Sequence, residues 1–284
     1  MTSSYDNICA MATPSGGAIG IVRVSGPDSI AIVERLFSRK ISEAKSHTMH
    51  YGVFASDSSM PVDDVMVGIF RAPHTYTGEN SVEIYCHGSR YIMSEIIRIL
   101  IESGCRQAEP GEFTRRAFVN GRMDLSQAEA VADLIAASGR ASHDMALGQL
   151  RGNISSELSS LRDKLLKMTS LMELELDFSD HEELEFADRS ELLQLATVIQ
   201  HRISSLASSF RTGQAIKQGI PVAIIGKTNV GKSTLLNRLV GEDKAIVSDI
   251  HGTTRDIIED TIDIHGITFR FVDTAGLRTT YDVI

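Results

Sequence analysis

The stretch IPVAIIGKTNVGKSTLLNRLV, residues 220–240, decides the fold of the segment around it. Its first six residues are apolar or β-branched apart from one proline, which predicts a short buried strand. Residues 226–233, GKTNVGKS, then place two glycines in a loop that ends in lysine and serine. Apolar residues recur at helical spacing after this loop, so the stretch predicts a strand, a glycine-rich loop and a helix in that order.

This arrangement is suited to binding the phosphates of a nucleotide. Gly226 and Gly231 allow the loop to turn backbone N–H groups towards phosphate oxygens, and the helix dipole favours the same negative charge. Lys232 is placed to reach the β- and γ-phosphates, and the Ser233 hydroxyl is placed to ligate Mg²⁺. The alternative is a glycine-rich turn that binds no ligand, which the strand and helix on either side disfavour.

Two later segments favour the nucleotide interpretation. Residues 252–256, GTTRD, contain Thr254, whose hydroxyl is suited to a second Mg²⁺ contact that senses the γ-phosphate. Residues 267–272, ITFRFV, predict a strand that leads into DTAG at 273–276, where Asp273 is placed to hold Mg²⁺ through water. A phosphate loop followed by two such switches is the order found in a GTPase.

The position after the second switch raises a question of mechanism. Ras-like GTPases carry a water-orienting glutamine there, whereas this chain carries Leu277. Leucine cannot orient water, so another residue, a metal cation or a second subunit must do so. Asn229 offers an amide oxygen to a monovalent cation, although a role as a turn residue fits the loop equally well.

Composition limits the class of protein. The chain has 284 residues, of which 42% are apolar, and this length allows two or three domains with cores of their own. Its three cysteines lack metal-ligand spacing and predict a reducing environment. The absence of a secretory pattern or a long apolar run predicts a soluble, cytoplasmic protein without membrane contact. A net charge of −9 argues against diffuse nucleic-acid binding by the whole surface.

Proline placement and periodicity divide the chain into parts. Residues 111–220 contain no proline, whereas residues 1–118 mix short β-rich runs with helical pieces and predict an α+β domain. The β-rich runs include 19–24 and 65–70, and the helical pieces are 28–37 and 91–103.

The middle of the chain predicts helices. A capping box at Ser126–Glu129 opens a helical run that reaches Leu176, and a second run covers about residues 190–215. Breaks in the first run are expected near three glycines, Gly139, Gly148 and Gly152.

Two charged clusters are predicted to be solvated. The acidic residues at 177–183 invite a metal-binding interpretation, but a solvated loop between helices fits them better because they lack a metal-specific spacing. Arg115, Arg116 and Arg122 form a compact basic group that is suited to phosphate or to an acidic ligand, with simple solvent exposure as the prediction.

Further motifs carry a resemblance to a known family. They are TPSGGAIGIVRVSG at 13–26, YTGENSVE at 76–83, CHG at 86–88, PGEFTRRAF at 110–118 and DLSQAEA at 124–130. With the nucleotide motifs, they resemble the MnmE (TrmE) family of tRNA-modification GTPases of bacteria and organelles. The resemblance covers essentially the whole chain and is specific to that family.

The resemblance implies a multidomain α/β fold of three parts. Residues 1–118 are expected to form an α+β N-terminal domain that binds folate and dimerises. Residues 119–218 are expected to form the first part of a helical domain, and residues 219–284 the N-terminal part of a P-loop, Ras-like G domain inserted into it.

The resemblance also implies the activity and the partners. A homodimer is expected to hydrolyse GTP and, with the flavoprotein MnmG (GidA), to modify C5 of the wobble uridine of certain tRNAs. A tetrahydrofolate derivative, 5-formyl- or methylene-tetrahydrofolate, is expected to provide the one-carbon unit. Two alternatives stay open on the residues, a ribosome-assembly-type GTPase and a folate-dependent one-carbon transferase without nucleotide control.

Family positions for the folate ligand match Arg23, Glu83 and Arg122. A carboxylate such as Glu83 can pair with the amino-pyrimidinone edge of a pterin, and arginines suit the carbonyl groups and the glutamate tail of a folate. Arginine stands at position 122 where the family commonly has lysine, which keeps the charge and changes the geometry.

For the nucleotide, the resemblance implies contacts with GTP or GDP in three segments. It implies Mg²⁺ at Ser233 and Thr254 and K⁺ at Asn229, Ser248, Ile250 and Thr253, with K⁺ in place of an arginine finger when two G domains pair. The nucleotide-binding residues are Asn229, Val230, Gly231, Lys232, Ser233, Thr234, Ser248, Asp249, Ile250, His251, Gly252, Thr253, Thr254, Asp273, Thr274, Ala275 and Gly276.

Some family features are expected beyond residue 284. The glutamate that orients the attacking water aligns directly after Ile284, and the guanine-selecting Asn-Lys-x-Asp segment and the C-terminal cysteine motif align later. We therefore assign no catalytic residue and expect little GTP hydrolysis by these 284 residues alone.

Overall fold

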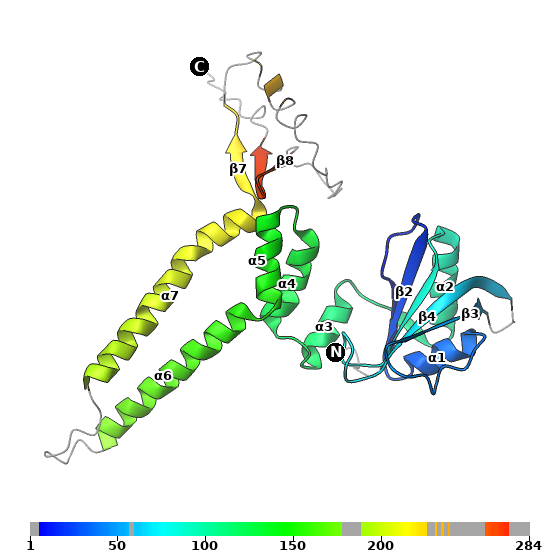
Figure 1. Ribbon diagram of the computed structural model, residues 1–284, viewed down its shortest axis with the longest axis horizontal. Coiled ribbons are helices and arrows are strands. Elements are labelled where there is room, and N and C mark those ends of the chain that lie inside the picture. The colour runs from blue at the N-terminus through cyan, green and yellow to red at the C-terminus, as the bar shows by residue number, and fades with distance from the viewer. Residues whose placement is uncertain are drawn as a thin grey trace, which may run out of the picture. The chain divides into compact units, whose positions relative to one another are not determined.

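The computed structural model describes residues 6–56, 60–177, 189–225, 231, 234–235, 238 and 259–272. The chain divides into two compact units, one up to Ala128 and one from Glu129 on. Each unit contains a sheet, and Figure 1 labels helices and strands in both. The fold is mixed α/β, as predicted.

The first unit is built on a six-stranded sheet in the order β3-β4-β5-β2-β1-β6. Neighbouring strands are antiparallel except β1 and β6, which are parallel. The strands predicted at 19–24 and 65–70 are confirmed as parts of β2 and β4. The six strands are β1 (Asn7–Met11), β2 (Ile19–Ser25), β3 (Thr48–Ala55), β4 (Pro61–Phe70), β5 (Ser81–His87) and β6 (Cys105–Gln107).

Helices α1 (Ser29–Leu36) and α2 (Arg90–Glu102) pack on one face of this sheet (Figure 1). Both match the helices predicted at 28–37 and 91–103. Apolar residues recur along α2 at helical spacing and are buried against the strands, which explains why the helix forms there. A third helix, α3 (Glu112–Val119), follows β6.

Strand β5 illustrates how the two faces of the sheet differ. Val82, Ile84 and Cys86 are buried in the core with α1 and α2. Because side chains alternate along a strand, Glu83 and Tyr85 lie on the opposite face. Charged and aromatic residues of β5 are thereby kept away from the core.

The register extends this opposite face across β3, β4, β5 and β2. Tyr51 pairs with Met66, Met66 with Tyr85, and Tyr85 with Ile21. Tyr51, on the edge strand β3, is 54% exposed and Met66, on the neighbouring β4, is 42% exposed, so large apolar side chains gather on a face that the core does not cover. We call this surface the open face, defined by Ile19, Ile21, Met49, Tyr51, Met66 and Tyr85.

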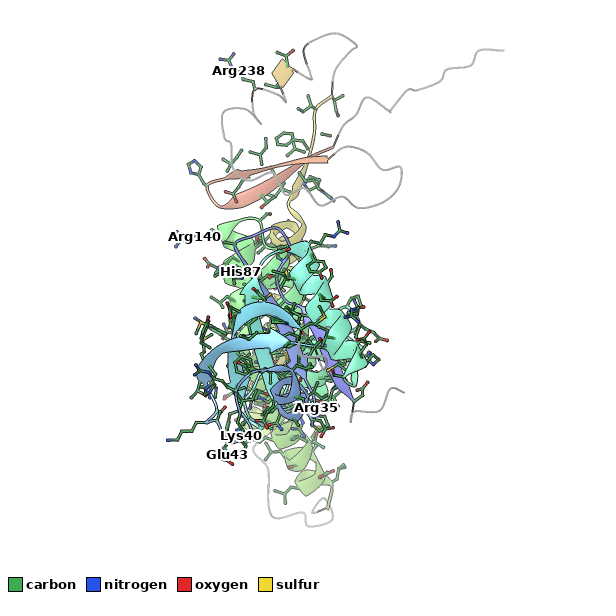
Figure 2. The ribbon with its side chains drawn as sticks, turned by 90° about the vertical axis from the view of Figure 1, so that its right-hand side faces the viewer. Arg35, Lys40, Glu43, His87, Arg140 and Arg238 are labelled. Carbon is green, nitrogen blue, oxygen red and sulfur yellow. The ribbon has the colours of Figure 1, made fainter. Side chains whose placement is uncertain are left out.

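His87, labelled in Figure 2, ends β5 next to the open face. Its Nδ1 lies 2.8 Å from Oδ1 of Asp63, and its backbone N–H donates to Oδ2 of the same carboxylate at 2.8 Å. Ile19, the first residue of β2, pairs with His87 in the antiparallel register. These bonds tie the end of β5 to the start of β4.

The second unit is mainly helical. Helix α4 crosses the division between the units, and α5, α6 and α7 follow it in the described part of the chain. Helices α6 and α7 contact each other and bury Leu161 and Ile199. The helices are α4 (Leu125–Ala136), α5 (Arg140–Leu150), α6 (Asn153–Asp177) and α7 (Arg189–Gln218).

Two details of the helical prediction are wrong. The cap of α4 is formed by Asp124 and Gln127, because the backbone N–H of each donates to the other's side-chain oxygen, at 2.9 and 2.8 Å. The predicted box at Ser126–Glu129 lies inside the helix instead. Gly148 does not break a helix, since it lies within α5, whereas the breaks at Gly139 and Gly152 are confirmed.

The second unit also contains a three-stranded sheet in the order β7-β9-β8. Strand β9 covers the predicted residues 267–272, and β7 covers the first part of the predicted strand at 220–225. Within the described residues, no helix combines the length and the apolar character that crossing a membrane requires. The three strands are β7 (Ile220–Ala223), β8 (Glu259–Ile264) and β9 (Ile267–Val272).

A close backbone contact joins the β1–β2 loop to the end of β5. The N–H of Gly16 donates to the carbonyl of Gly88 at 2.8 Å, and the N–H of Gly88 donates to the carbonyl of Ala18 at 3.2 Å. A Cβ added at Gly88 would lie 2.1 Å from the backbone oxygen of Gly17. Only glycine fits at position 88 without moving this loop.

We therefore expect Gly88→Ala to destabilise the first unit by about 2–4 kcal/mol, because backbone atoms must move to admit the methyl group. Denaturant unfolding, followed by amide hydrogen exchange in β2 and β5, measures this loss. Gly17→Ala is the matched control, since its added Cβ meets only an oxygen at 3.7 Å. Equal stability of the two variants would contradict the assigned contact.

Candidate functional site

Two of the predicted folate residues face each other across neighbouring strands. Arg23 of β2 pairs with Glu83 of β5 in the antiparallel register. Their neighbours along the strands, such as Val22 and Val82, are buried in the core. Arg23 and Glu83 therefore lie on the opposite side of the sheet, next to the open face.

The pair is directly bonded. Nη2 and Nε of Arg23 lie 2.7 and 2.9 Å from Oε1 of Glu83. The side chain of Glu83 is 17% exposed, so its carboxylate is largely shielded from water. Partial shielding strengthens such an ion pair relative to one on a fully hydrated surface.

Tyr85 supplies the second contact of this carboxylate. Its hydroxyl donates to Oε2 of Glu83 at 2.7 Å. The hydrogen bond to Glu83 is the main cause that raises the pKa of Tyr85 above its ordinary value, and burial acts in the same direction. The phenol is therefore a persistent hydrogen-bond donor to Glu83.

Two aromatic rings flank the guanidinium of Arg23. Its Cζ lies 5.9 Å from the ring centroid of Tyr76 and 5.7 Å from that of Phe113. Tyr76 comes from the loop of residues 71–80, and Phe113 comes from α3. The Tyr76 hydroxyl lies 2.8 Å from Oγ1 of Thr114, which links the loop to the same helix. We call Arg23, Tyr76, Glu83, Tyr85 and Phe113 the arginine–carboxylate site.

Arg122 contacts the same loop at another point. Its Nε donates to the carbonyl of Thr75 at 3.1 Å. Gly78 has a φ of +79°, and a Cβ added there would lie 3.2 Å from Cγ of Arg122. The structure thus places all three predicted folate residues around the 71–80 loop, with Arg23 and Glu83 in contact and Arg122 joined to them through the loop.

A cluster of ionic residues holds α3 and the loop against the sheet. Arg116 is 8% exposed and Glu112 is 2% exposed, and their side chains lie 3.2 Å apart. Arg106 of β6 binds Glu112 with two hydrogen bonds of 2.7 and 3.1 Å. Asp6 pairs with both Arg106 and Arg116. We call Asp6, Glu79, Arg106, Glu112 and Arg116 the ionic cluster.

The predicted solvent exposure of the basic group is therefore wrong for Arg116, which is buried among carboxylates. Arg115 pairs with Glu109 at 3.2 Å and is half exposed. The sequence around Arg116 does not show that Asp6 and Glu79 approach it from distant parts of the chain. This is why sequence reasoning missed the cluster.

Glu79 connects the ionic cluster to the candidate site. It accepts a hydrogen bond from Ser25 of β2 at 2.8 Å and lies 3.2 Å from Arg116. Ser25 also lies 2.8 Å from the hydroxyl of Thr77 in the same loop. The loop that carries Tyr76 is thereby fixed to β2 on one side and to α3 on the other.

Sequence reasoning assigned no role to Tyr76, Tyr85 or Phe113, although all three lie in or next to the quoted motifs. The alternation of side chains along β5 is a signal that pairs Tyr85 with Glu83 on one face. No comparable local signal joins Tyr76 and Phe113 to Arg23, because they come from a loop and from a helix far along the chain.

The nucleotide residues are mostly outside the described part of the chain. Gly231 is described and has a φ of +93°, which suits a glycine in a tight loop, and a helical turn includes Thr234. Strands β7 and β9 are parallel, so their carboxyl ends lie at the same edge of the sheet. The remaining predicted nucleotide and metal ligands, at 229–230, 232–233, 248–254 and 273–276, lie outside the described residues.

Other predicted groups have a mixed outcome. Most of the acidic cluster at 177–183 lies outside the described residues. Among the described residues, no group of three or more histidine, cysteine or acidic side chains is arranged to hold a metal ion. All three cysteines are free and buried, consistent with the absence of a disulfide framework.

Comparison with known proteins gives two family matches. A model described as the MnmE helical domain matches residues 125–276, and a model described as the N-terminus of GTP-binding protein TrmE matches residues 7–122. The relatives below carry the name tRNA modification GTPase MnmE. One from Bacteroides fragilis is 60% identical over 286 residues, 99% of this chain and 61% of its own length.

Two further relatives are similarly close. The protein of Parabacteroides distasonis is 61% identical over 283 residues, which cover 98% of this chain and 61% of that protein. The protein of Porphyromonas gingivalis is 56% identical over 285 residues, which cover 98% of this chain and 60% of that protein. This chain therefore spans about three fifths of the length of the curated relatives it matches.

The ionic cluster makes the first unit sensitive to acid. The hydrogen bonds of Arg106, with those of the Glu109 N–H and of Arg116, lower the pKa of Glu112 from 4.5 to about 2. Because the pKa is lower in the folded state, the stabilisation is complete above about pH 4.5 and disappears as the pH falls towards 2. We expect this carboxyl to contribute up to about 3 kcal/mol to the free energy of unfolding at pH 7.

Glu112→Gln should remove this contribution and flatten the fall in stability between pH 4.5 and pH 2. Denaturant unfolding at several pH values, with hydrogen exchange in β1 and β6 as the reporter, measures the effect. Glu109→Gln is the control, since that side chain is 55% exposed and should change stability little. An unchanged acid profile in Glu112→Gln would show that the cluster does not stabilise the fold.

Proposed function

The chain belongs to the MnmE family, and we propose that it serves tRNA modification as a GTP-hydrolysing protein that also binds a tetrahydrofolate derivative. The relatives carry the name tRNA modification GTPase, and their similarity extends over nearly all of this chain. We propose that it acts in the cytoplasm, with the flavoprotein MnmG, on C5 of the wobble uridine of certain tRNAs. The domain boundaries proposed for this activity are 1–118, 119–218 and 219–284.

The arginine–carboxylate site is the observation that carries the folate part of this proposal. A pterin presents two neighbouring N–H donors on its amino-pyrimidinone edge, which match the two oxygens of a carboxylate such as Glu83. The rings of Tyr76 and Phe113 offer flat apolar faces for stacking. The carboxylate acceptor and the aromatic faces of the site therefore fit a pterin.

The two arginines suit other parts of a folate. Arg23 is close enough to Glu83 to contact a carbonyl group of a pterin bound there, and Arg122 offers a charge to the glutamate tail. Glu83 binds and orients the ring, and the two aromatic side chains exclude water from it. When bound, 5-formyl- or methylene-tetrahydrofolate supplies the one-carbon unit.

The nucleotide part of the proposal rests on the order of the motifs and on the second sheet. Parallel strands β7 and β9 bring the chain after each strand to the same edge, where a phosphate loop and a switch are expected to meet. The proposed ligands are Ser233 and Thr254 for Mg²⁺, and Asn229 with the loop at 248–253 for K⁺. In this arrangement K⁺ provides the positive charge that an arginine finger provides elsewhere.

The open face supports the proposed homodimer. Its side chains form a continuous row across four neighbouring strands of the first unit, and four of them, Ile19, Met49, Tyr51 and Met66, are exposed in the single chain. A second copy of the same domain would bury this row and place the two arginine–carboxylate sites near one interface.

Calorimetric titration with GDP and with 5-formyltetrahydrofolate tests the two ligand sites separately. We expect the wild-type chain to bind both ligands. Lys232→Ala should abolish nucleotide binding and leave folate binding intact, because only the phosphates lose a contact. Glu83→Gln should weaken folate binding at least about tenfold and leave GDP binding intact, because it removes the charged acceptor.

Each alternative function predicts a different pattern in this titration. A ribosome-assembly-type GTPase binds GDP and no folate, and a transferase without nucleotide control binds folate and no GDP. Loss of both ligands in either variant would indicate a folding defect, which circular dichroism detects. Folate binding that is unchanged in Glu83→Gln would contradict the proposed site.

For the dimer, we expect Met66→Glu to raise the dissociation constant at least about tenfold, because the change buries a charge in an apolar interface. Sedimentation equilibrium of the 284-residue chain measures this dissociation constant. Tyr91→Glu is the control, since Tyr91 is 73% exposed on α2, on the other side of the sheet. A wild-type chain that stays monomeric, or a variant that dimerises normally, would contradict the proposal.

A further inference from the structure

The hydroxyl of Tyr85 holds the one carboxylate on which the proposed folate site depends. Tyr85 follows Glu83 by two residues on β5, so both side chains lie on the same face of the sheet. The hydrogen bond between them is 2.7 Å long and uses Oε2, the oxygen that the contacts of Arg23 leave open. The carboxylate is thereby oriented from two sides.

The acceptor capacity of Glu83 determines what happens when a ligand arrives. A carboxylate offers about four lone-pair positions, two on each oxygen. The Nε–H of Arg23 donates to Oε1, Nη2 of the same guanidinium lies 2.7 Å from that oxygen, and the Tyr85 hydroxyl occupies one position on Oε2. Oε2 therefore keeps one position for a further donor beside the Tyr85 hydroxyl.

A pterin edge needs one acceptor position on each oxygen, because its two N–H donors are parallel. On Oε1 the guanidinium of Arg23, with Nη2 at 2.7 Å and Nε at 2.9 Å, must shift to admit such an edge. Tyr85 need not move, since Oε2 accepts a second hydrogen bond beside that of the hydroxyl. During ligand binding, Tyr85 is thus the contact that keeps the carboxylate in place.

We propose that Tyr85 is a positioning residue of the folate site, whose hydroxyl fixes Glu83 in the orientation that accepts the amino-pyrimidinone edge of a pterin. This inference rests on the proposed folate function. Tyr85 acts through Glu83 and need not touch the ligand. Because the contact is a hydroxyl donating to a charged group, its removal should cost more than that of a neutral hydrogen bond.

Two substitutions at position 85 distinguish this role from simple packing. Tyr85→Phe keeps the ring and removes the donor, whereas Tyr85→Gln removes the ring and retains an N–H donor. The affinity of the 284-residue chain for 5-formyltetrahydrofolate is measured by calorimetry. We expect Tyr85→Phe to weaken binding about tenfold and Tyr85→Gln to stay within about threefold of wild type.

Tyr91→Phe is the matched control and should bind folate like the wild type, since Tyr91 lies on α2 and away from Glu83. The thermal unfolding midpoint of each variant is measured alongside, so that a loss of binding is compared only among folded proteins. A higher folate affinity of Tyr85→Gln than of Tyr85→Phe supports the proposal.

Other outcomes overturn it. Wild-type affinity in Tyr85→Phe would mean that the hydroxyl is not needed, and an equal or larger loss in Tyr85→Gln would mean that Tyr85 acts through its ring. If the wild-type chain itself fails to bind 5-formyltetrahydrofolate, the proposed folate function falls together with this inference. Binding by the wild type with no effect in Tyr85→Phe overturns the inference alone.

Discussion

The register of β2 against β5 is the constraint on which the candidate site depends. It places Arg23 opposite Glu83 on the face of the sheet that points away from α1, α2 and the core. A slip of β2 by one residue would turn Arg23 inwards and separate it from Glu83, and breaking or burying an ion pair in this way costs several kcal/mol. The buried valines and isoleucine that alternate with these charges therefore position the site as well as stabilise the sheet, namely Val22, Val24, Val82 and Ile84.

A second constraint comes from charges and not from apolar packing. The ionic cluster joins Asp6, which precedes β1, to β6, the 71–80 loop and α3, and the side chains of Glu79, Glu112 and Arg116 are largely hidden from water. Buried ion pairs contribute little net stability compared with apolar replacements, but they demand a specific geometry. That geometry places Tyr76 and Phe113 beside Arg23. The aromatic part of the site is thus positioned by electrostatics, while its ionic part is positioned by a β-ladder.

Local patterns in the sequence predicted the elements that they govern. Apolar alternation and helical periodicity located β2, β9, α1, α2 and α7, because each pattern reflects the burial of one face.

The start of α4 was predicted wrongly because the sequence offers two similar capping patterns there. Two capping patterns overlap by two residues at the start of α4, and the bonds between Asp124 and Gln127 decide for the earlier one. Burial of Arg116 was unpredictable locally, since its carboxylate partners are contributed by Asp6, Glu79 and Glu112, two of them distant in the sequence. The family resemblance predicted that Arg23 and Glu83 share a ligand site, but not that they pair with each other.

The central claim is that a carboxylate, held beside an arginine and between aromatic side chains, is the pterin-recognising group of a protein that also binds a nucleotide. The structure of the chain bound to 5-formyltetrahydrofolate, determined by crystallography, tests this claim most directly. The account predicts that the amino-pyrimidinone edge contacts both oxygens of Glu83, with Arg23 shifted from Oε1 and with Tyr76 or Phe113 against the ring. A folate bound elsewhere, with the bonds between Arg23 and Glu83 unchanged, would contradict it.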